Sequence, residues 1–350
     1  MTVNRARKSS LFVIVLMLSA CGGGSAPTPA PGPVATPSPT PTPAPAPPPA
    51  TGSVERDIDP LLTSGAITSN FSPHVAINPE PAVAAKGRLF VMLPGTGAVP
   101  RFYRFILRAG TPRGYHALGV TYPNDIAVGT LCGTSIVADC AGMVRNEIIT
   151  GADTSPLVSV NAANSITGRL VSLITYLSST FPNEGWGQYL TGGQPNWALI
   201  TVAGHSQGAG HAGYLAKLRS LDRAVMFSGP GDVGVAPGSP ALWLSQPNVT
   251  PASRQYGFTH TGDDVVSLAL VTRNWGVIGL DAFGSPVSVD SIASPFANAR
   301  QLTTSAAPNP ATPASVESAN HAAPVVDVAT PVTAQGQPVY LPVWAYLAFP

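Results

Sequence analysis

The sequence predicts an α/β domain in which a mainly parallel central sheet carries helices on both faces. Short apolar runs rich in β-branched residues alternate along the chain with segments of helical periodicity. Such alternation favours parallel pairing, because each helix returns the chain to the starting edge of the sheet. About 300 residues follow an N-terminal region of unusual composition, and that length suits one large domain. We therefore expect the domain to span residues 53–350.

The first 21 residues have the pattern of an export signal. A basic N-terminus precedes an apolar run from Leu11 to Leu18, and small residues stand directly before Cys21. The run is too short for a stable transmembrane helix. The segment resembles a bacterial lipoprotein signal, which implies export, lipidation of Cys21 and a membrane anchor; the alternative is a plain secretory signal. Gly22 stands where an acidic residue would favour inner-membrane retention, so the resemblance favours the outer membrane.

Residues 22–52 are dominated by Pro, Ala and Thr. A segment of this composition cannot bury a core, so we expect an extended, disordered linker. At about 3.1 Å per residue, the Pro, Ala and Thr repeats at 26–52 can hold the domain up to roughly 80 Å from a membrane surface.

The charge pattern gives no support for a nucleic-acid partner. The formal net charge is only +1 at pH 7, and no basic cluster occurs along the sequence. Nucleic-acid binding therefore lacks an electrostatic basis, and we expect no such partner.

Cys132 and Cys140 lie in one short glycine-containing segment (LCGTSIVADC). In an exported protein, two cysteines so close in sequence favour a local disulfide. The alternative is a metal site, but no nearby histidine or second cysteine pair completes one. We therefore expect the disulfide and no metal.

The first half of the domain contains two predicted strands. Residues 51–87 are loop-rich and give little signal. Apolar runs at 88–93 and 115–122 predict strands, and a proline begins the turn after each of them. Residues 101–108 predict a short helix between the strands, and a further helix is expected to run through Arg145.

The second half of the domain begins with the clearest helix, predicted at 165–181. Its apolar residues recur on one helical face, and Pro182 ends it. Helices are also expected after Ser206 and after Asp263, and the tail from Tyr340 favours a helix, although its aromatic content also allows a strand. Three further strands are predicted at 197–203, 223–228 and 254–261.

The pentapeptide Gly204-His205-Ser206-Gln207-Gly208 follows the third predicted strand. It reads G-x-S-x-G, a short pattern that carries weight only between a strand and a helix. A small-residue segment with basic residues near its end comes next and predicts that helix. Gly204 and Gly208 let the two arms of the turn pass closely and lift the serine hydroxyl clear of the sheet. Ser206 is the candidate nucleophile; the alternative is a Gly-rich turn with a capping serine.

A serine nucleophile needs a base, and the chain has six histidines. In the α/β-hydrolase order, an acid and then the histidine follow the serine. His205 is expected to point away from the site and His211 to pack behind the turn, which leaves His260 and His321. His321 lies in a late loop from which it can reach back to Ser206, so it is the candidate base.

The candidate acid is Asp263, at the turn after the strand predicted at 254–261. A capping role is an alternative for this residue and its neighbour, because aspartate is favoured at helix starts. Asp264 is the nearer rival as acid, and Asp232, after the preceding strand, is the more distant one.

Two backbone amides are expected to form the oxyanion hole. The first belongs to Gln207, at the helix start after the nucleophile, and the second to the loop after Leu93. Glycines at 95 and 97 allow that loop to approach a substrate closely, so Thr96 is the expected second donor.

The chain resembles a family of exported bacterial α/β-hydrolases with an esterase-like pattern. The segments that carry the resemblance are LPGTGAVPRFY, GYHALGVTYPND, the cysteine-containing loop, VAGHSQGAGHAGYLA, RAVMFSGPGD and NHAAPVVD. The resemblance covers most of the chain from about Arg88 onward. It implies the α/β-hydrolase fold and a Ser206–His321–Asp263 triad, and it implies no particular substrate.

We therefore expect a serine hydrolase that cleaves small-molecule or lipid-like carboxylic esters through an acyl-enzyme, without a cofactor. The alternatives are an acyltransferase that uses the same intermediate and a non-catalytic lipoprotein that uses the scaffold for binding. Residues 233–252 are expected to form part of an acyl or alcohol pocket around Trp243; the alternative is a packed surface loop. The sequence makes no prediction of the oligomeric state.

Overall fold

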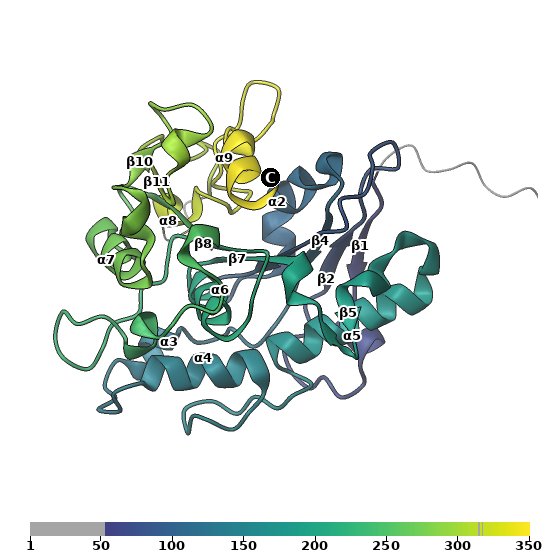
Figure 1. Ribbon diagram of the computed structural model, residues 1–350, viewed down its shortest axis with the longest axis horizontal. Helices are drawn as coiled ribbons and strands as arrows, with labels where there is room; N and C mark the ends of the chain where they lie inside the picture. The colour runs from purple at the N-terminus through teal and green to yellow at the C-terminus, as the bar shows by residue number, and fades with distance from the viewer. Residues whose placement is uncertain (1–52, 314–315, 317) are drawn as a thin grey trace, which may run out of the picture. The chain divides into compact units, whose positions relative to one another are not determined.

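The structure, a computed structural model, describes residues 53–313, 316 and 318–350. The predicted signal, the predicted lipidation site Cys21 and the predicted linker lie outside the described residues. Within the described part, a central sheet lies between two helical layers (Figure 1). No helix in these ranges is long and apolar enough to cross a membrane.

The described residues form a nine-stranded sheet in the order β1-β2-β4-β3-β7-β8-β9-β11-β10. The pairings of β2 with β1 and with β4 are antiparallel, whereas all pairings from β4 to β10 are parallel. The prediction of a mainly parallel sheet is therefore confirmed. The strands are β1 (Glu55–Ile58), β2 (His74–Ile77), β3 (Leu89–Leu93), β4 (His116–Gly119), β7 (Ile200–His205), β8 (Arg223–Phe227), β9 (Gln255–His260), β10 (Val287–Ser288) and β11 (Gln301–Thr304).

Helices α1 to α7 lie between strands of the sheet along the chain, and α8 and α9 follow its last strand, β11. A small hairpin, β5 (Leu190–Thr191) with β6 (Gln194–Pro195), stands apart from it. The helices are α1 (Pro60–Thr63), α2 (Arg104–Ala109), α3 (Val128–Cys132), α4 (Cys140–Thr150), α5 (Ile166–Thr180), α6 (Gln207–Leu218), α7 (Leu268–Ile278), α8 (Ala319–Ala322) and α9 (Leu341–Ala348).

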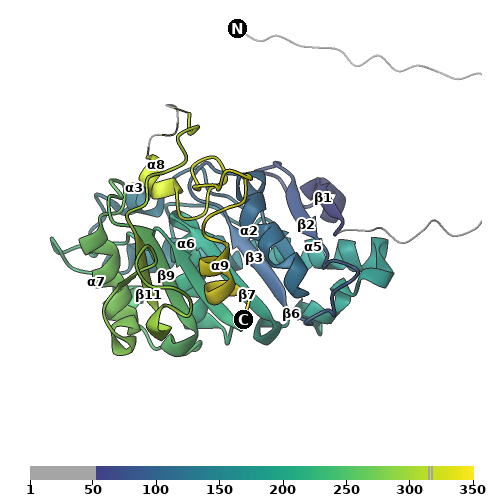
Figure 2. The same ribbon diagram turned by 90° about the horizontal axis from the view of Figure 1, so that it is seen from above.

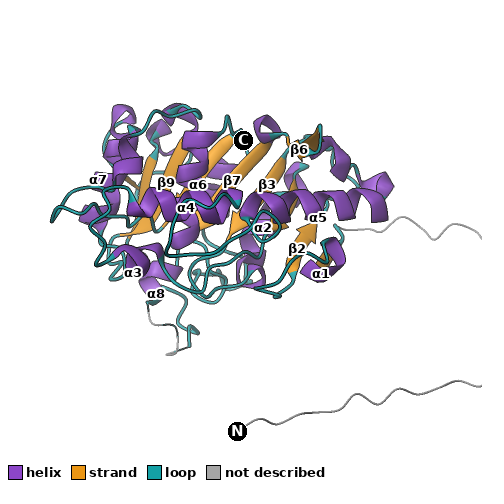
Figure 3. Ribbon diagram, turned by 90° about the horizontal axis from the view of Figure 1, so that it is seen from below, coloured by secondary structure: helices purple, strands orange, loops and turns teal. Residues whose placement is uncertain are grey.

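Each face of the sheet has its own apolar core. Side chains alternate between the two faces along a strand, so Leu89, Val91 and Leu93 join a core with α4, α5 and α6. Phe90 and Met92 of the same strand join a second core with α2 and α9. Figure 2 shows α2 and α9 over one face, and Figure 3 shows α4, α5 and α6 over the other. The predicted cover of helices on both faces is thus confirmed.

Several boundaries differ from the predictions. The strand predicted at 197–203 begins only at Ile200, because Trp197–Leu199 form a 3₁₀ turn. Helix α7 begins at Leu268 rather than beside Asp263, since Ser267 accepts the N–H of Leu270 and caps it. The tail is helical, as favoured. Strands β1, β2, β10 and β11 were not predicted; none exceeds four residues, too short for a clear alternating pattern.

Candidate active site

Ser206 occupies the sharp turn between β7 and α6, at the carboxyl edge of the sheet. Its backbone has φ 54° and ψ −116°, a strained conformation for a residue with a side chain. Two glycines allow this turn: a Cβ on Gly204 would overlap the carbonyl of Gly208, and a Cβ on Gly208 would overlap that of Leu93. The predicted strand–turn–helix context is present, and Ser206 is partly exposed where both neighbours are buried.

His321 and Asp263, which are far apart in sequence, meet at the same edge of the sheet. The Nδ1 of His321 lies 2.8 Å from Oδ2 of Asp263. Because a carboxylate oxygen accepts, Nδ1 carries the proton and Nε2 is the free acceptor. His321 Nε2 is buried and has no hydrogen-bond partner among the described residues. The imidazole therefore has the tautomer that a general base requires.

Asp263 is held in place by the backbone that follows it. Its Oδ1 accepts the N–H groups of Val265 and Val266 at 3.0 and 2.9 Å, while Oδ2 faces His321. Its side chain is fully buried. The residue thus combines the predicted orienting contact with a turn-capping role, so the two interpretations from sequence are not exclusive.

The main chain of His321 is bonded directly to the serine turn. Its carbonyl oxygen accepts hydrogen bonds from Nε2 of His205, at 3.0 Å, and from Oγ of Ser228, at 2.8 Å. His321 therefore lies beside the residue that precedes Ser206, not in a distant loop. Within the described ranges no hydrogen bond joins the Ser206 hydroxyl to His321; such contacts are often longer without substrate.

Helix α8 carries His321, where the sequence predicted a loop. Ser318 caps this four-residue helix, and its hydroxyl accepts the N–H of His321 at 3.2 Å. The same hydroxyl donates to Asp264, and this bond lowers the pKa of the exposed Asp264 carboxyl. Asp264 therefore supports the cap of α8, and among the described residues the imidazole hydrogen-bonds to Asp263 rather than to Asp264. Figures 2 and 3 show α8 and α3 along the same edge of the sheet.

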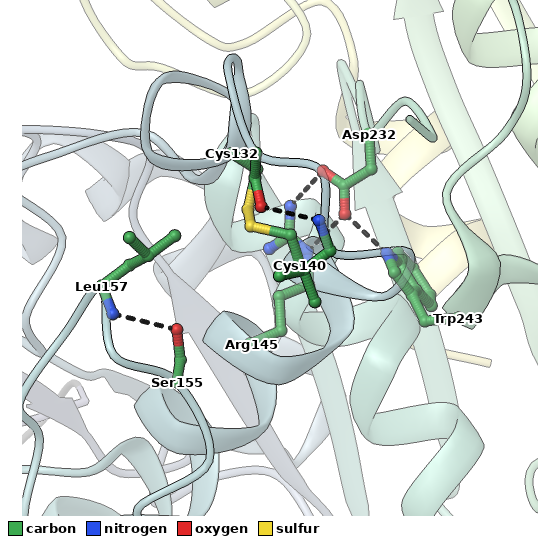
Figure 4. Close-up of a disulfide and its surroundings, with 9 residues drawn as sticks. Cys132, Cys140, Arg145, Ser155, Leu157, Asp232 and Trp243 are labelled. Carbon is green, nitrogen blue, oxygen red and sulfur yellow. Dashed lines mark hydrogen bonds and ion pairs between the residues drawn. A yellow bond between two sulfur atoms is a disulfide. The ribbon is translucent and has the colours of Figure 1, made fainter. Parts of the chain in front are cut away.

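Asp232, the more distant rival, belongs to a buried ion pair beneath the serine turn (Figure 4). Arg145 donates to its two carboxylate oxygens at 2.6 and 2.5 Å, and Trp243 Nε1 donates at 2.6 Å. Arg145 also donates to the carbonyl of Gln207 at 3.0 Å. The carboxylate of Asp232 is thus neutralised and supports the start of α6 from below.

His260, the alternative base, has both ring nitrogens occupied. Its Nδ1 accepts the N–H of Gly262 at 2.9 Å, and its Nε2 lies 3.2 Å from the carbonyl of Ala306. His211 packs behind the turn, as expected: it is fully buried beside Arg145, and burial lowers its pKa well below the usual value.

The loop after β3 lies against Ser206. A Cβ built on Gly95 would stand 3.2 Å from the Cβ of Ser206. Thr96 Oγ1 donates to Oε1 of Gln207 at 2.8 Å, so the two residues predicted to supply oxyanion donors are joined. Neither of their backbone N–H groups has a hydrogen-bond partner in the described part of the chain. Asn124, which the sequence did not single out, fixes the loop by donating to Gly95 O at 2.6 Å.

The predicted pocket around Trp243 is wrong in its central residue. Trp243 is fully buried and packs against Tyr214 in the core. Its indole N–H donates to the buried carboxylate of Asp232, which holds the ring inside the domain. The start of the same segment does line a cavity: Val233 and Val235 face Cys132 and its surroundings across about 80 Å³. A larger cavity of about 510 Å³ lies between α2 and α9 and contains none of the predicted site residues.

Cys132 and Cys140 lie at disulfide distance, as predicted, with sulfur atoms 1.96 Å apart (Figure 4). The bridge joins the end of α3 to the start of α4, the helix that carries Arg145. Within residues that the structure describes, no group of three His, Cys, Asp or Glu side chains could hold a metal ion.

No known protein family matches the sequence, and no curated protein matches it significantly.

Proposed function

We propose that the chain is a serine hydrolase of the α/β-hydrolase fold that cleaves carboxylic esters. The observation that carries the proposal is the meeting of three segments: the strained Ser206 turn, the 2.8 Å contact between His321 and Asp263, and the bond from His205 to the His321 carbonyl. A nucleophile, a base of the correct tautomer and an orienting carboxylate are the parts that acyl transfer needs.

In the proposed reaction, Ser206 attacks the ester carbonyl while His321 Nε2 takes the hydroxyl proton. Asp263 holds the imidazole and stabilises the imidazolium that forms. The amides of Gln207 and Thr96 bind the oxyanion. The imidazolium then protonates the leaving alcohol, and water, deprotonated by the same imidazole, releases the acid from the acyl-enzyme.

Apolar side chains on the loops around this edge favour an apolar, lipid-like ester. Phe102 follows β3, Val233 and Val235 follow β8, and Val265 follows Asp263; all four side chains are exposed. Each of these side chains belongs to a segment that follows the carboxyl end of a parallel strand, and exposed apolar side chains at such an edge are typical of a binding surface for an apolar partner. We expect longer acyl chains to be preferred over acetyl in a series of p-nitrophenyl esters.

Labelling with a fluorophosphonate probe tests the proposal. The purified chain is compared with Ser206→Ala and His321→Ala, and thermal unfolding confirms that each variant is folded. We expect labelling of the wild type that both substitutions abolish. A folded wild type that takes no label would overturn the hydrolase proposal and would favour a non-catalytic binding role. Product analysis with an added alcohol separates hydrolysis from acyl transfer.

We also propose that the chain is exported and attached to the outer membrane through a lipid on Cys21. The proposal rests on the signal-like pattern of residues 1–21. Metabolic labelling with a radioactive fatty acid, which we expect Cys21→Ser to abolish, tests it independently of any activity.

A further inference from the structure

His205 has a buried imidazole whose two nitrogens are both paired. Nδ1 lies 3.1 Å from the hydroxyl of Tyr103, and Nε2 lies 3.0 Å from the carbonyl oxygen of His321. A carbonyl oxygen can only accept, so Nε2 carries the proton and Nδ1 accepts the Tyr103 proton. Burial lowers the pKa of His205 to about 3 and raises that of Tyr103. Both groups are therefore neutral at ordinary pH, and the tautomer is fixed.

The chain of hydrogen bonds continues to the loop after β3. The Tyr103 hydroxyl accepts the N–H of Gly95 at 3.0 Å. Three successive bonds thus lead from Gly95, next to Thr96, through Tyr103 and His205 to the main chain of His321. Tyr103 is fully buried and His205 nearly so, so water does not compete for these bonds.

The His321 carbonyl is fixed by two donors, because Ser228 Oγ adds its bond at 2.8 Å. Helix α8 has only four residues and cannot by itself define the direction of a side chain. A carbonyl anchored from two sides restrains the His321 peptide and, with Asp263, the direction in which Nε2 points.

We propose that His205 is a positioning residue: it fixes the position of the proposed base, His321, relative to the proposed oxyanion loop at Gly95 and Thr96. The inference rests on the proposed function. His205 touches neither the substrate nor the reacting atoms; it acts through the His321 carbonyl at one end and through Tyr103 and Gly95 at the other. A displacement of about 1 Å can cost on the order of 100-fold in rate. A restraint on the position of His321 is therefore expected to affect kcat.

The chain offers a matched control at His116, the first residue of β4, which lies at the amino ends of the parallel strands whereas Ser206 lies at their carboxyl ends. His116 is equally buried. Its Nδ1 lies 2.8 Å from the Tyr189 hydroxyl, and its Nε2 lies 2.8 Å from the Glu184 carbonyl. The same tyrosine–histidine–carbonyl arrangement therefore occurs once beside Ser206 and once far from it.

The test compares His205→Phe, His205→Gln and His116→Phe in the full chain. With p-nitrophenyl butyrate, we expect His205→Phe to lower kcat about 10- to 100-fold while KM stays within about threefold. We expect His205→Gln to recover part of kcat, because its carboxamide N–H can donate to the His321 carbonyl. His116→Phe should show a similar loss of Tm and a wild-type kcat. Equal kcat in the two phenylalanine variants would overturn the inference.

A second measurement does not depend on turnover. The Nδ1 proton of His321, bonded to Asp263, should give a downfield proton NMR signal. We expect this signal to shift or vanish in His205→Phe and to persist in His116→Phe. An unchanged signal in His205→Phe would overturn the positioning role. Absence of fluorophosphonate labelling in the wild type would instead overturn the proposed function, so the two failures are distinguishable.

Discussion

Replacement of Asp232 by alanine should destabilise the domain strongly, because it leaves Arg145 buried without its carboxylate. The two side chains are only 4% and 2% exposed. Asp232 accepts two hydrogen bonds from the guanidinium and one from Trp243. All three donors lose their acceptor in Asp232→Ala, and water cannot replace it without opening the core beneath α6.

The size of the loss follows from burial. Removing one partner of a buried ion pair costs about 3–5 kcal/mol. Unfolding entropy is about 2.1 cal/mol/K per residue, so a domain of about 300 residues has an unfolding entropy of about 0.6 kcal/mol/K. We therefore expect Asp232→Ala to lower Tm by about 5–8 °C.

Thermal unfolding followed by circular dichroism measures the effect. Asp264→Ala is the control, because its carboxylate is exposed and its side-chain partner among the described residues is Ser318; its Tm should stay within roughly 2 °C of the wild type. Asp232→Leu keeps much of the volume but not the charge and should be destabilised similarly. If Asp232→Ala and Asp264→Ala shift Tm equally, the ion pair is not a major source of stability and the argument from burial is refuted.

Three further predictions concern the acid, the buried histidines and the disulfide. Asp263→Asn should lower kcat by about 10⁴ through loss of the correct imidazole tautomer, whereas Asp264→Asn should stay within about threefold; steady-state kinetics on one ester decides, and equal losses would contradict the assignment. Burial lowers the pKa of His74 and of His205 to about 3, so below pH 6.5 the unfolded chain binds more protons than the folded one and stability falls with falling pH down to about 3. At pH 5 each of these two histidines should lower the free energy of unfolding by about 2 kcal/mol relative to pH 7. Urea unfolding at pH 7 and pH 5 checks this, and His74→Gln should reduce the number of protons taken up on unfolding by one. Replacement of both Cys132 and Cys140 by serine should cost about 2–3 kcal/mol, the loop-closure value for so short a loop, as measured by urea unfolding; an unchanged midpoint would argue against the entropic account.

The sequence was most informative where local pattern and fold agree. Apolar runs followed by Gly or Pro predicted β3, β4, β7 and β8, because buried parallel strands are nearly continuous apolar segments. Strand β9 was also predicted, although its sequence is more polar. The same strands place Ser206 and Asp263 at one edge. The chain order of serine, acid and histidine then selected His321, whose contact with Asp263 depends on this shared edge.

Other features depend on packing between distant segments and left no local signal. Nothing near Asp232 in the sequence indicates that Arg145, 87 positions earlier, neutralises it. Trp243 resembled a pocket residue because an apolar side chain in a Pro- and Gly-rich segment has the same pattern whether it is exposed or buried. The prediction that His205 points away from the site is wrong, because its imidazole bonds to the carbonyl of His321, 116 positions later. Its other partner, Tyr103, ends the 3₁₀ helix Pro100–Tyr103 that follows the loop after β3.

The described chain enters the fold through β1, at the edge of the sheet farthest from β10. Ion pairs from Arg104 and Arg108 to Glu55, together with backbone bonds to β2, hold this strand. Three strands, β2, β4 and β3, separate β1 from β7 and the Ser206 turn. Mechanical tension applied through the N-terminal segment would therefore load β1 first. If β1 separates from β2 under this load, the strands that carry the candidate site would keep their pairing.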